Sequence, residues 1–97
     1  MNELTIRKEK NISIIDFNLL EDWESFEIII DKLKSFFHAN VIEEIDGPES
    51  RIRFMRIKNA EFILINNPYG NYLKATAIDG MEALKLIYND WSIYNKL

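Results

Sequence analysis

The stretch from Val41 to Ile78 decides the fold, and it reads VIEEIDGPESRIRFMRIKNAEFILINNPYGNYLKATAI. Short apolar segments alternate here with three groups of turn-forming residues, at positions 46–50, 58–61 and 67–71. Gly tolerates positive φ and Pro fixes its own φ, so the first and third groups are typical of tight connections. Short apolar segments joined by such turns predict an antiparallel meander of four strands.

Charge pairing suggests the register of the first hairpin in this meander. We expect the cross-strand pairs Asp46–Arg51, Glu44–Arg53 and Ile45–Ile52. An ion pair beside an apolar pair is favourable across two antiparallel strands. Ile57 is out of step with the inward phase that Ile52 and Phe54 would set, which predicts a β-bulge near Met55 and Arg56.

The second half of the meander is apolar on both faces. Residues 62–65, Phe-Ile-Leu-Ile, are typical of a central strand, and residues 71–77 alternate, with Leu73, Ala75 and Ala77 on the inward side. The outward side is too apolar for an ordinary wet surface, with Ile63, Ile65, Tyr72 and Thr76. Either the N-terminal hairpin or another chain should cover it, and homodimerisation through the sheet face or edge is expected.

The segments that flank the meander supply a hairpin and two helices. Residues 3–8 and 11–17 predict a β-hairpin whose place in the sheet stays open, and Asn18 followed by Glu21 predicts a helix start. The apolar stripe of that helix is Leu19, Trp23, Phe26, Ile30, Leu33 and Phe37, and the helix should end near residues 38–40. A second helix, capped by Asp79, carries Leu84, Ile87, Tyr88, Trp91 and Tyr94. The prediction is one α+β domain, residues 1–97, of order ββαββββα, with both helices on one face of the sheet.

Composition excludes several classes of protein. The 97 residues are 47% hydrophobic, which is ample for a core and excludes a disordered chain. Without cysteine the chain has no disulfide and no thiolate nucleophile. The formal net charge of −4 argues against a general nucleic-acid binder. Residues 1–8 lack the apolar run of a signal peptide and no apolar run is long enough to span a membrane, so we expect a cytoplasmic protein with no membrane partner.

One end of the predicted sheet is the candidate binding site. Alternate connections of a meander lie at the same end, so the loops at 46–51 and 66–71 should be neighbours, and the second helix should return towards them. We name this end the loop rim. Its candidate binding residues are Asp46, Glu49, Arg51, Asn66, Asn67, Tyr69, Asn71 and Trp91. The competing interpretation is ordinary turn chemistry, because turns need Gly, Pro, Asn and Asp whatever the function.

Catalytic and metal-binding patterns are weak. His38 is the only histidine, and it is better placed to bond the last carbonyls of the first helix than to anchor a triad or a metal site. Glu24, Glu27 and Asp31 give that helix an acidic face, which is either solvated or a docking surface for a basic partner. We therefore predict no catalytic residue, no metal and no cofactor.

Three functional hypotheses follow, in order of preference. The first is a protein-interaction domain of immunity or regulatory type, a class of small, acidic, cysteine-poor α+β domains, which binds another protein or a second copy of itself. The second is a small-ligand or enzyme module that uses Arg51, Asn67 and Tyr69 of the loop rim; it requires a concave pocket with a strongly perturbed pKa. The third is an RNA-binding accessory domain that uses Arg51, Arg53 and Arg56, which with Lys58 form a row of cations on one predicted strand. It requires arginine side chains free of carboxylate partners.

Overall fold

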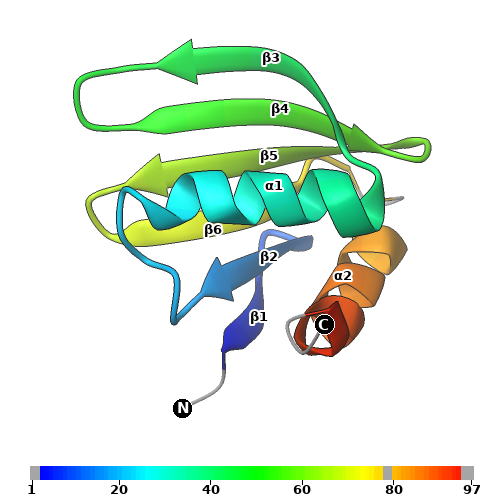
Figure 1. Ribbon diagram of the computed structural model, residues 1–97. Coiled ribbons are helices and arrows are strands. Elements are labelled where there is room, and N and C mark those ends of the chain that lie inside the picture. The colour runs from blue at the N-terminus through cyan, green and yellow to red at the C-terminus, as the bar shows by residue number, and fades with distance from the viewer. Residues whose placement is uncertain (1–2, 78–79, 95–97) are drawn as a thin grey trace.

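The computed structural model describes residues 3–77 and 80–94. Its element order, ββαββββα, confirms the predicted α+β class (Figure 1). The elements are β1 (Leu4–Glu9), β2 (Ile12–Phe17), α1 (Ser25–Phe37), β3 (Asn40–Asp46), β4 (Arg51–Ile57), β5 (Ala60–Asn67), β6 (Gly70–Ala75) and α2 (Met81–Tyr94). In the part of the chain that the structure describes, neither helix is long and apolar enough to cross a bilayer.

All six strands form one antiparallel sheet in the order β1-β2-β6-β5-β4-β3. The predicted meander is present, and β5 is central in it. The N-terminal hairpin pairs through β2 with β6, where Ile15 lies opposite Leu73. The hairpin therefore widens the sheet and does not cover its outward face.

The predicted register of the β3–β4 hairpin is confirmed for all three cross-strand pairs. The predicted bulge lies elsewhere: the irregularity is in β3, between Val41 and Glu43. β4 keeps a regular alternation, and its buried side chains are Arg51, Arg53, Met55 and Ile57. The assumed inward phase of Ile52 and Phe54 is thus wrong, and Ile57 is in step with the two buried arginines.

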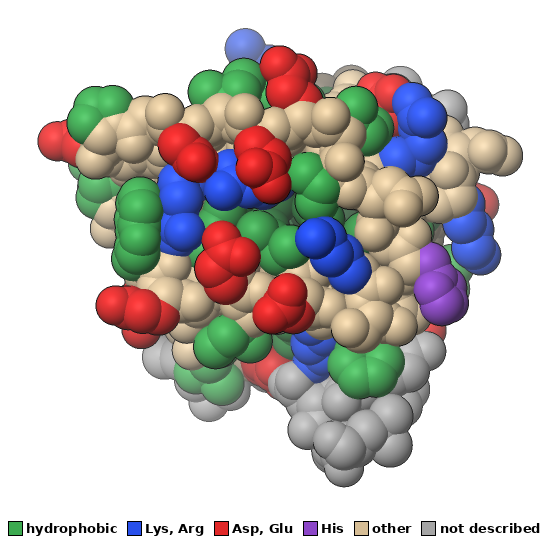
Figure 2. Space-filling model, turned by 45° about the horizontal axis from the view of Figure 1, so that its top comes forward, with side chains coloured by type: hydrophobic (Ala, Val, Ile, Leu, Met, Phe, Trp, Pro, Cys, Tyr) green, Lys and Arg blue, Asp and Glu red, His purple; other side chains and the backbone are tan. Residues whose placement is uncertain are grey.

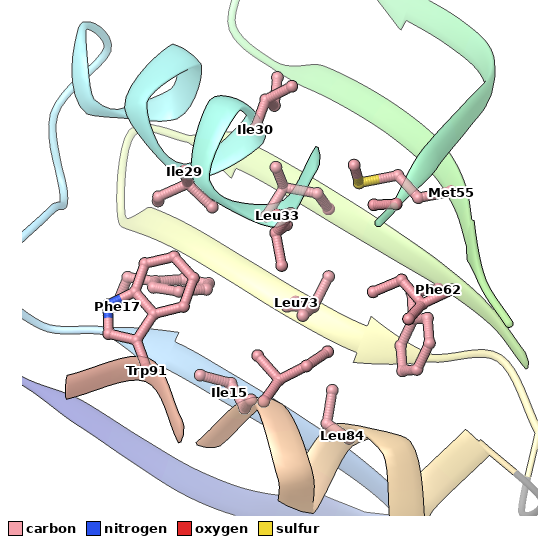
Figure 3. Close-up of a cluster of buried hydrophobic side chains, with 14 of the residues drawn as sticks. Ile15, Phe17, Ile29, Ile30, Leu33, Met55, Phe62, Leu73, Leu84 and Trp91 are labelled. Carbon is pink, nitrogen blue, oxygen red and sulfur yellow. The ribbon is translucent and has the colours of Figure 1, made fainter. Parts of the chain in front are cut away.

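Both helices pack on the same face of the sheet, as predicted. Figure 3 shows side chains from α1 and α2 converging on side chains of the sheet. Ile29 of α1, Leu84 of α2 and Leu73 of β6 are each fully buried in this core. The small side chain of Ala75, also fully buried, lets the second layer approach closely, as its inward position predicts.

Helix α1 begins later than the capping pattern predicts. Asn18 donates to Thr5 Oγ1 at 2.6 Å and so belongs to the hairpin, while Asp22 accepts a hydrogen bond from the backbone N–H of Ser25 at 2.9 Å. Side chains of the sheet bind the carbonyl groups of residues 20, 22 and 23, which keeps this segment out of the helix. Leu19 and Trp23 are consequently exposed and lie outside the buried stripe.

The end of α1 is as predicted, and His38 forms its cap. This residue is left-handed, with φ 58° and ψ 37°, and the N–H of Ala39 donates to the carbonyl of Leu33 at 3.1 Å. A left-handed conformation costs a residue with a Cβ atom about 1–2 kcal/mol, and glycine avoids this cost. The higher conformational entropy of glycine in the unfolded state cancels part of that gain. We expect His38→Gly to raise the free energy of unfolding by about 0.5–1 kcal/mol in urea denaturation, and a decrease would contradict this role.

The beginning of α2 lies partly outside the described residues. The predicted cap, Asp79, is one of the residues that the structure does not describe. From Met81 the helix packs against β2 and β6. Its buried residues, Leu84, Ile87 and Trp91, match the predicted stripe.

Candidate functional site

The loop rim exists as predicted. Arg51 lies opposite Asn66 on neighbouring strands, and Asn66 lies opposite Asn71, so the β3–β4 and β5–β6 connections are adjacent. Figure 1 shows both connections at the same end of the sheet, beside the segment that leads into α1. Turns far apart in the sequence therefore share one edge of the molecule.

Two asparagines of the rim are structural. The amide of Asn71 donates to the carbonyl of Leu20 at 2.7 Å and to that of Asp22 at 3.2 Å. Asn66 donates to Asn71 Oδ1 at 2.7 Å. Both side chains are buried, and they bind the entry of α1 to the sheet. Asn66 Oδ1 is buried without a hydrogen-bond partner, whereas the other side-chain polar groups of the two asparagines bind within the fold.

Arg51 is likewise part of the packing. Its guanidinium lies 3.7 Å from the ring centroid of Trp23 and 4.4 Å from that of Phe26. It also donates to the carbonyl of Trp23 and lies 3.6 Å from a carboxylate oxygen of Glu27. This buried arginine therefore joins β4 to the first turn of α1.

The remaining predicted residues separate into exposed and buried ones. Glu49 and Tyr69 are exposed, Asn67 accepts a hydrogen bond from the N–H of Tyr69 at 2.9 Å, and Asp46 binds Arg53. Trp91 does not reach the rim surface. It is fully buried in the core, where its ring packs edge-on against Phe17, at a centroid distance of 5.1 Å.

A small hollow of about 330 Å³ lies between the rim connections and the entry of α1. Its lining residues are Glu21, Asp22, Trp23, Pro48, Glu49, Asn66, Asn67 and Pro68. Hydrogen bonds from the Ser25 hydroxyl and N–H lower the pKa of Asp22. A general base needs a raised pKa, so this carboxylate is suited to capping α1 and not to proton transfer.

The predicted row of cations on β4 is divided between the two faces of the sheet. Arg53, on the helix side, donates to Asp46 at 2.7 Å and lies 3.6 Å from Glu44. Arg56, on the opposite side, pairs with Glu61 at 3.0 Å. With carboxylate partners on both, neither arginine is free for phosphate binding.

Carboxylates surround the buried arginines. Figure 2 shows Lys and Arg side chains in a hollow of the surface between α1 and β3, with Asp and Glu side chains on both sides. Glu24, which directly precedes α1, and Glu27 and Asp31 within it are exposed, as are Glu44 and Asp46 of β3. We name these five residues the acidic surface. The fold adds the β3 carboxylates to the acidic helix face that the sequence predicts.

A larger hollow lies at the end of the sheet opposite the rim, and the sequence did not predict it. Its volume is about 630 Å³. It is lined by Phe36, Phe37, His38, Ile57, Lys58, Asn59, Ala60, Glu82, Ala83, Leu86, Ile87 and Asp90. The available signal was Leu86, an apolar residue off the predicted α2 stripe. Residues 3–77 and 80–94 contain no cluster of three acidic or histidine side chains that could hold a metal here or elsewhere.

The face of the sheet opposite the helices carries an apolar patch, which we name the helix-free face. Its apolar members lie on β3, β4 and β5, and they are Ile45, Ile52, Phe54, Ile63 and Ile65. Ile45 is 46% exposed and the other four are half-buried by one another. Within the described chain both helices lie on the other side. The outward apolar surface that the sequence indicated is thus left uncovered by α1 and α2.

Comparison with protein-family models, with curated proteins and with solved structures finds no match to this chain. Four surfaces of the described chain are the candidate functional sites. These are the loop rim, the acidic surface, the hollow beside Leu86 and the helix-free face.

Proposed function

We propose that this chain is a protein-interaction domain, and that the helix-free face binds its partner. The observation that supports this is the continuous apolar patch from Ile45 to Ile65 on three neighbouring strands. An antiparallel sheet exposed on one side normally alternates apolar and polar residues, with the polar ones in water. A contiguous apolar surface is instead typical of a protein–protein contact.

The alternative hypotheses have less support. An enzyme needs a titratable group whose pKa is shifted towards its task. The lowered pKa of Asp22 has a structural cause in its hydrogen bonds from Ser25. An RNA-binding sheet needs free cations, and Arg53 is paired with Glu44 and Asp46. These observations favour recognition of a protein over catalysis or RNA binding.

The acidic surface favours a second candidate, which is recognition of a basic partner protein as in immunity-type binding. The specific observation is that β3 adds Glu44 and Asp46 to the carboxylates of α1. Trp23 and Ile28 are 50% and 54% exposed beside them and offer apolar contact area. Charges at the periphery of such an interface would raise the association rate more than the affinity.

Site-specific photo-crosslinking tests both surfaces. A benzophenone amino acid replaces Phe54 on the helix-free face, Ile28 beside the acidic surface, or exposed Lys85 of α2 as the control. In cells that naturally produce the chain, we expect a protein adduct from position 54 and none from position 85, because only the first lies in the patch. An adduct from position 28 alone would identify the acidic surface, and not the helix-free face, as the binding site. Adducts from neither position would contradict a protein-interaction function.

A further inference from the structure

Side chains on the helix-free face stand in rows that cross the sheet. The register places Lys74 of β6, Ile63 of β5, Phe54 of β4 and Glu43 of β3 side by side in one row. The row thus has a cation at one end, an anion at the other and two apolar side chains between them. Neighbouring strands are about 4.8 Å apart, so the two charges are separated by about 14 Å.

A second row lies one step further along the strands. It consists of Tyr72, Ile65, Ile52 and Ile45 on the same four strands. Burial raises the pKa of Tyr72, as expected for a hydroxyl beside an apolar surface. The two rows together form a largely apolar block, whose polar groups are the charges of Lys74 and Glu43 and the hydroxyl of Tyr72.

These two charges differ from the others on this face. Arg7 pairs with Asp16 at 2.8 Å, and Arg56 pairs with Glu61 at 3.0 Å. Among residues 3–77 and 80–94, neither Lys74 nor Glu43 forms an ion pair. Lys74 is half-buried between Ile14 and Ile63 on the adjacent strands. The chain therefore leaves one cation and one anion without partners at opposite ends of an apolar row.

A twofold axis pairs these charges. If the axis runs parallel to the strands midway between β4 and β5, β6 of one copy faces β3 of the other, and β5 faces β4. Lys74 then faces Glu43 of the second copy, and the symmetry repeats this contact. Stacked sheets pack about 10 Å apart, with strands nearly aligned, which lysine and glutamate side chains can bridge between them.

We propose that the partner of the helix-free face is a second copy of this chain, which packs sheet against sheet about this axis. The proposal rests on the proposed function and specifies the partner. The same symmetry sets Ile63 against Phe54 of the second copy, Ile65 against Ile52, and Tyr72 against Ile45. Twofold interfaces require one surface to be complementary to itself, and the rows have this property in both charge and apolar character.

Charge reversal provides the test. Lys74→Glu and Glu43→Lys each place two like-charged pairs in the symmetric interface. Like charges across an interface cost several kcal/mol, so each single variant should dimerise about a hundredfold more weakly than the wild type. The double variant restores two opposite-charge pairs and should dimerise like the wild type. Sedimentation velocity over a range of concentrations measures all four proteins.

Mixing the two single variants gives the sharper result. Each Lys74→Glu chain should dimerise with a Glu43→Lys chain, because both contacts then join opposite charges. Both substitutions are at residues outside the core, and circular dichroism should show unchanged folding. Single variants that dimerise like the wild type, or a mixture that stays monomeric, would overturn the proposed arrangement.

The crosslink from position 54 separates this inference from the proposed function. An adduct of two copies of the chain supports the sheet-to-sheet dimer. An adduct with a different protein, together with a wild type that stays monomeric in sedimentation, overturns the second copy as partner and leaves the interaction function standing. Lack of any adduct contradicts both.

Discussion

Trp91→Ala is expected to lower the free energy of unfolding by about 3–5 kcal/mol, a large part of the roughly 5–15 kcal/mol that stabilises a small domain. Trp91 is fully buried, stacks on Phe37 at 6.2 Å between ring centroids and donates to Glu3 at 2.9 Å. Its removal leaves a cavity where both helices meet the sheet. Urea denaturation followed by far-UV circular dichroism measures the loss.

The other tryptophan is the matched control. Trp23 is half-exposed, and its ring covers the Arg51 guanidinium. Trp23→Ala should therefore cost only about 1 kcal/mol, chiefly through the lost cation–π contact. If Trp91→Ala is too unstable to purify, Trp91→Phe preserves most of the packing and should cost about 1–2 kcal/mol. Equal effects of the two alanine variants would contradict the central position of Trp91.

Asn71→Ala is expected to destabilise the chain by about 2–3 kcal/mol. The substitution removes the donor to two carbonyl groups, Leu20 and Asp22, and the acceptor of Asn66, all in a buried setting. Buried polar groups left without partners cost about 1–3 kcal/mol each, part of which relaxation recovers. Thermal unfolding measures the shift.

Asn67→Ala is the control for the loop rim. Asn67 is on the same connection, and its side chain makes a local bond to the N–H of Tyr69. A turn contact of this kind should contribute no more than about 0.5–1 kcal/mol. If Asn71→Ala unfolded at the wild-type temperature, the buried hydrogen bonds of Asn71 would not stabilise the fold. The loop rim would then again be a candidate binding site.

Much of the meander could be predicted from local chemistry. The Asp-Gly-Pro turn and the opposed charges of Glu44 and Arg53 define a register that β3 and β4 adopt. The phase of β4 could not be predicted in the same way. Charged side chains normally face water, yet the buried arginines are covered by the rings of Trp23 and Phe26. That cover exists only once α1 has packed.

The start of α1 was mispredicted for a related reason. Asn18 and Glu21 satisfy a capping pattern, but the carbonyl of Leu20 is held by Asn71, which lies 51 positions away. A local sequence pattern carries no information about a hydrogen bond from a distant strand. The predicted site members other than Trp91 lie at the rim, but Asn66 and Asn71 form hydrogen bonds that hold the fold together.

The hollow beside Leu86 was beyond sequence reasoning because three separate segments of the chain form it, at residues 36–38, 57–60 and 82–90. The apolar helix-free face, in contrast, was visible from Ile63 and Ile65, which lie in a segment that is apolar on both faces. What the sequence could not show was whether the N-terminal hairpin folds over that face. Pairing of β2 with β6 answers this through three backbone register pairs.

The irregularity in β3 has a consequence for how copies of this chain can meet. β3 is an edge strand, and a flat edge can recruit further strands without limit, as in amyloid growth. The extra residue, Ile42, increases the local twist, and Glu43, Glu44 and Asp46 would repel another β3 laid alongside. Edge-to-edge polymerisation is thereby discouraged, whereas a face-to-face contact closes after two copies.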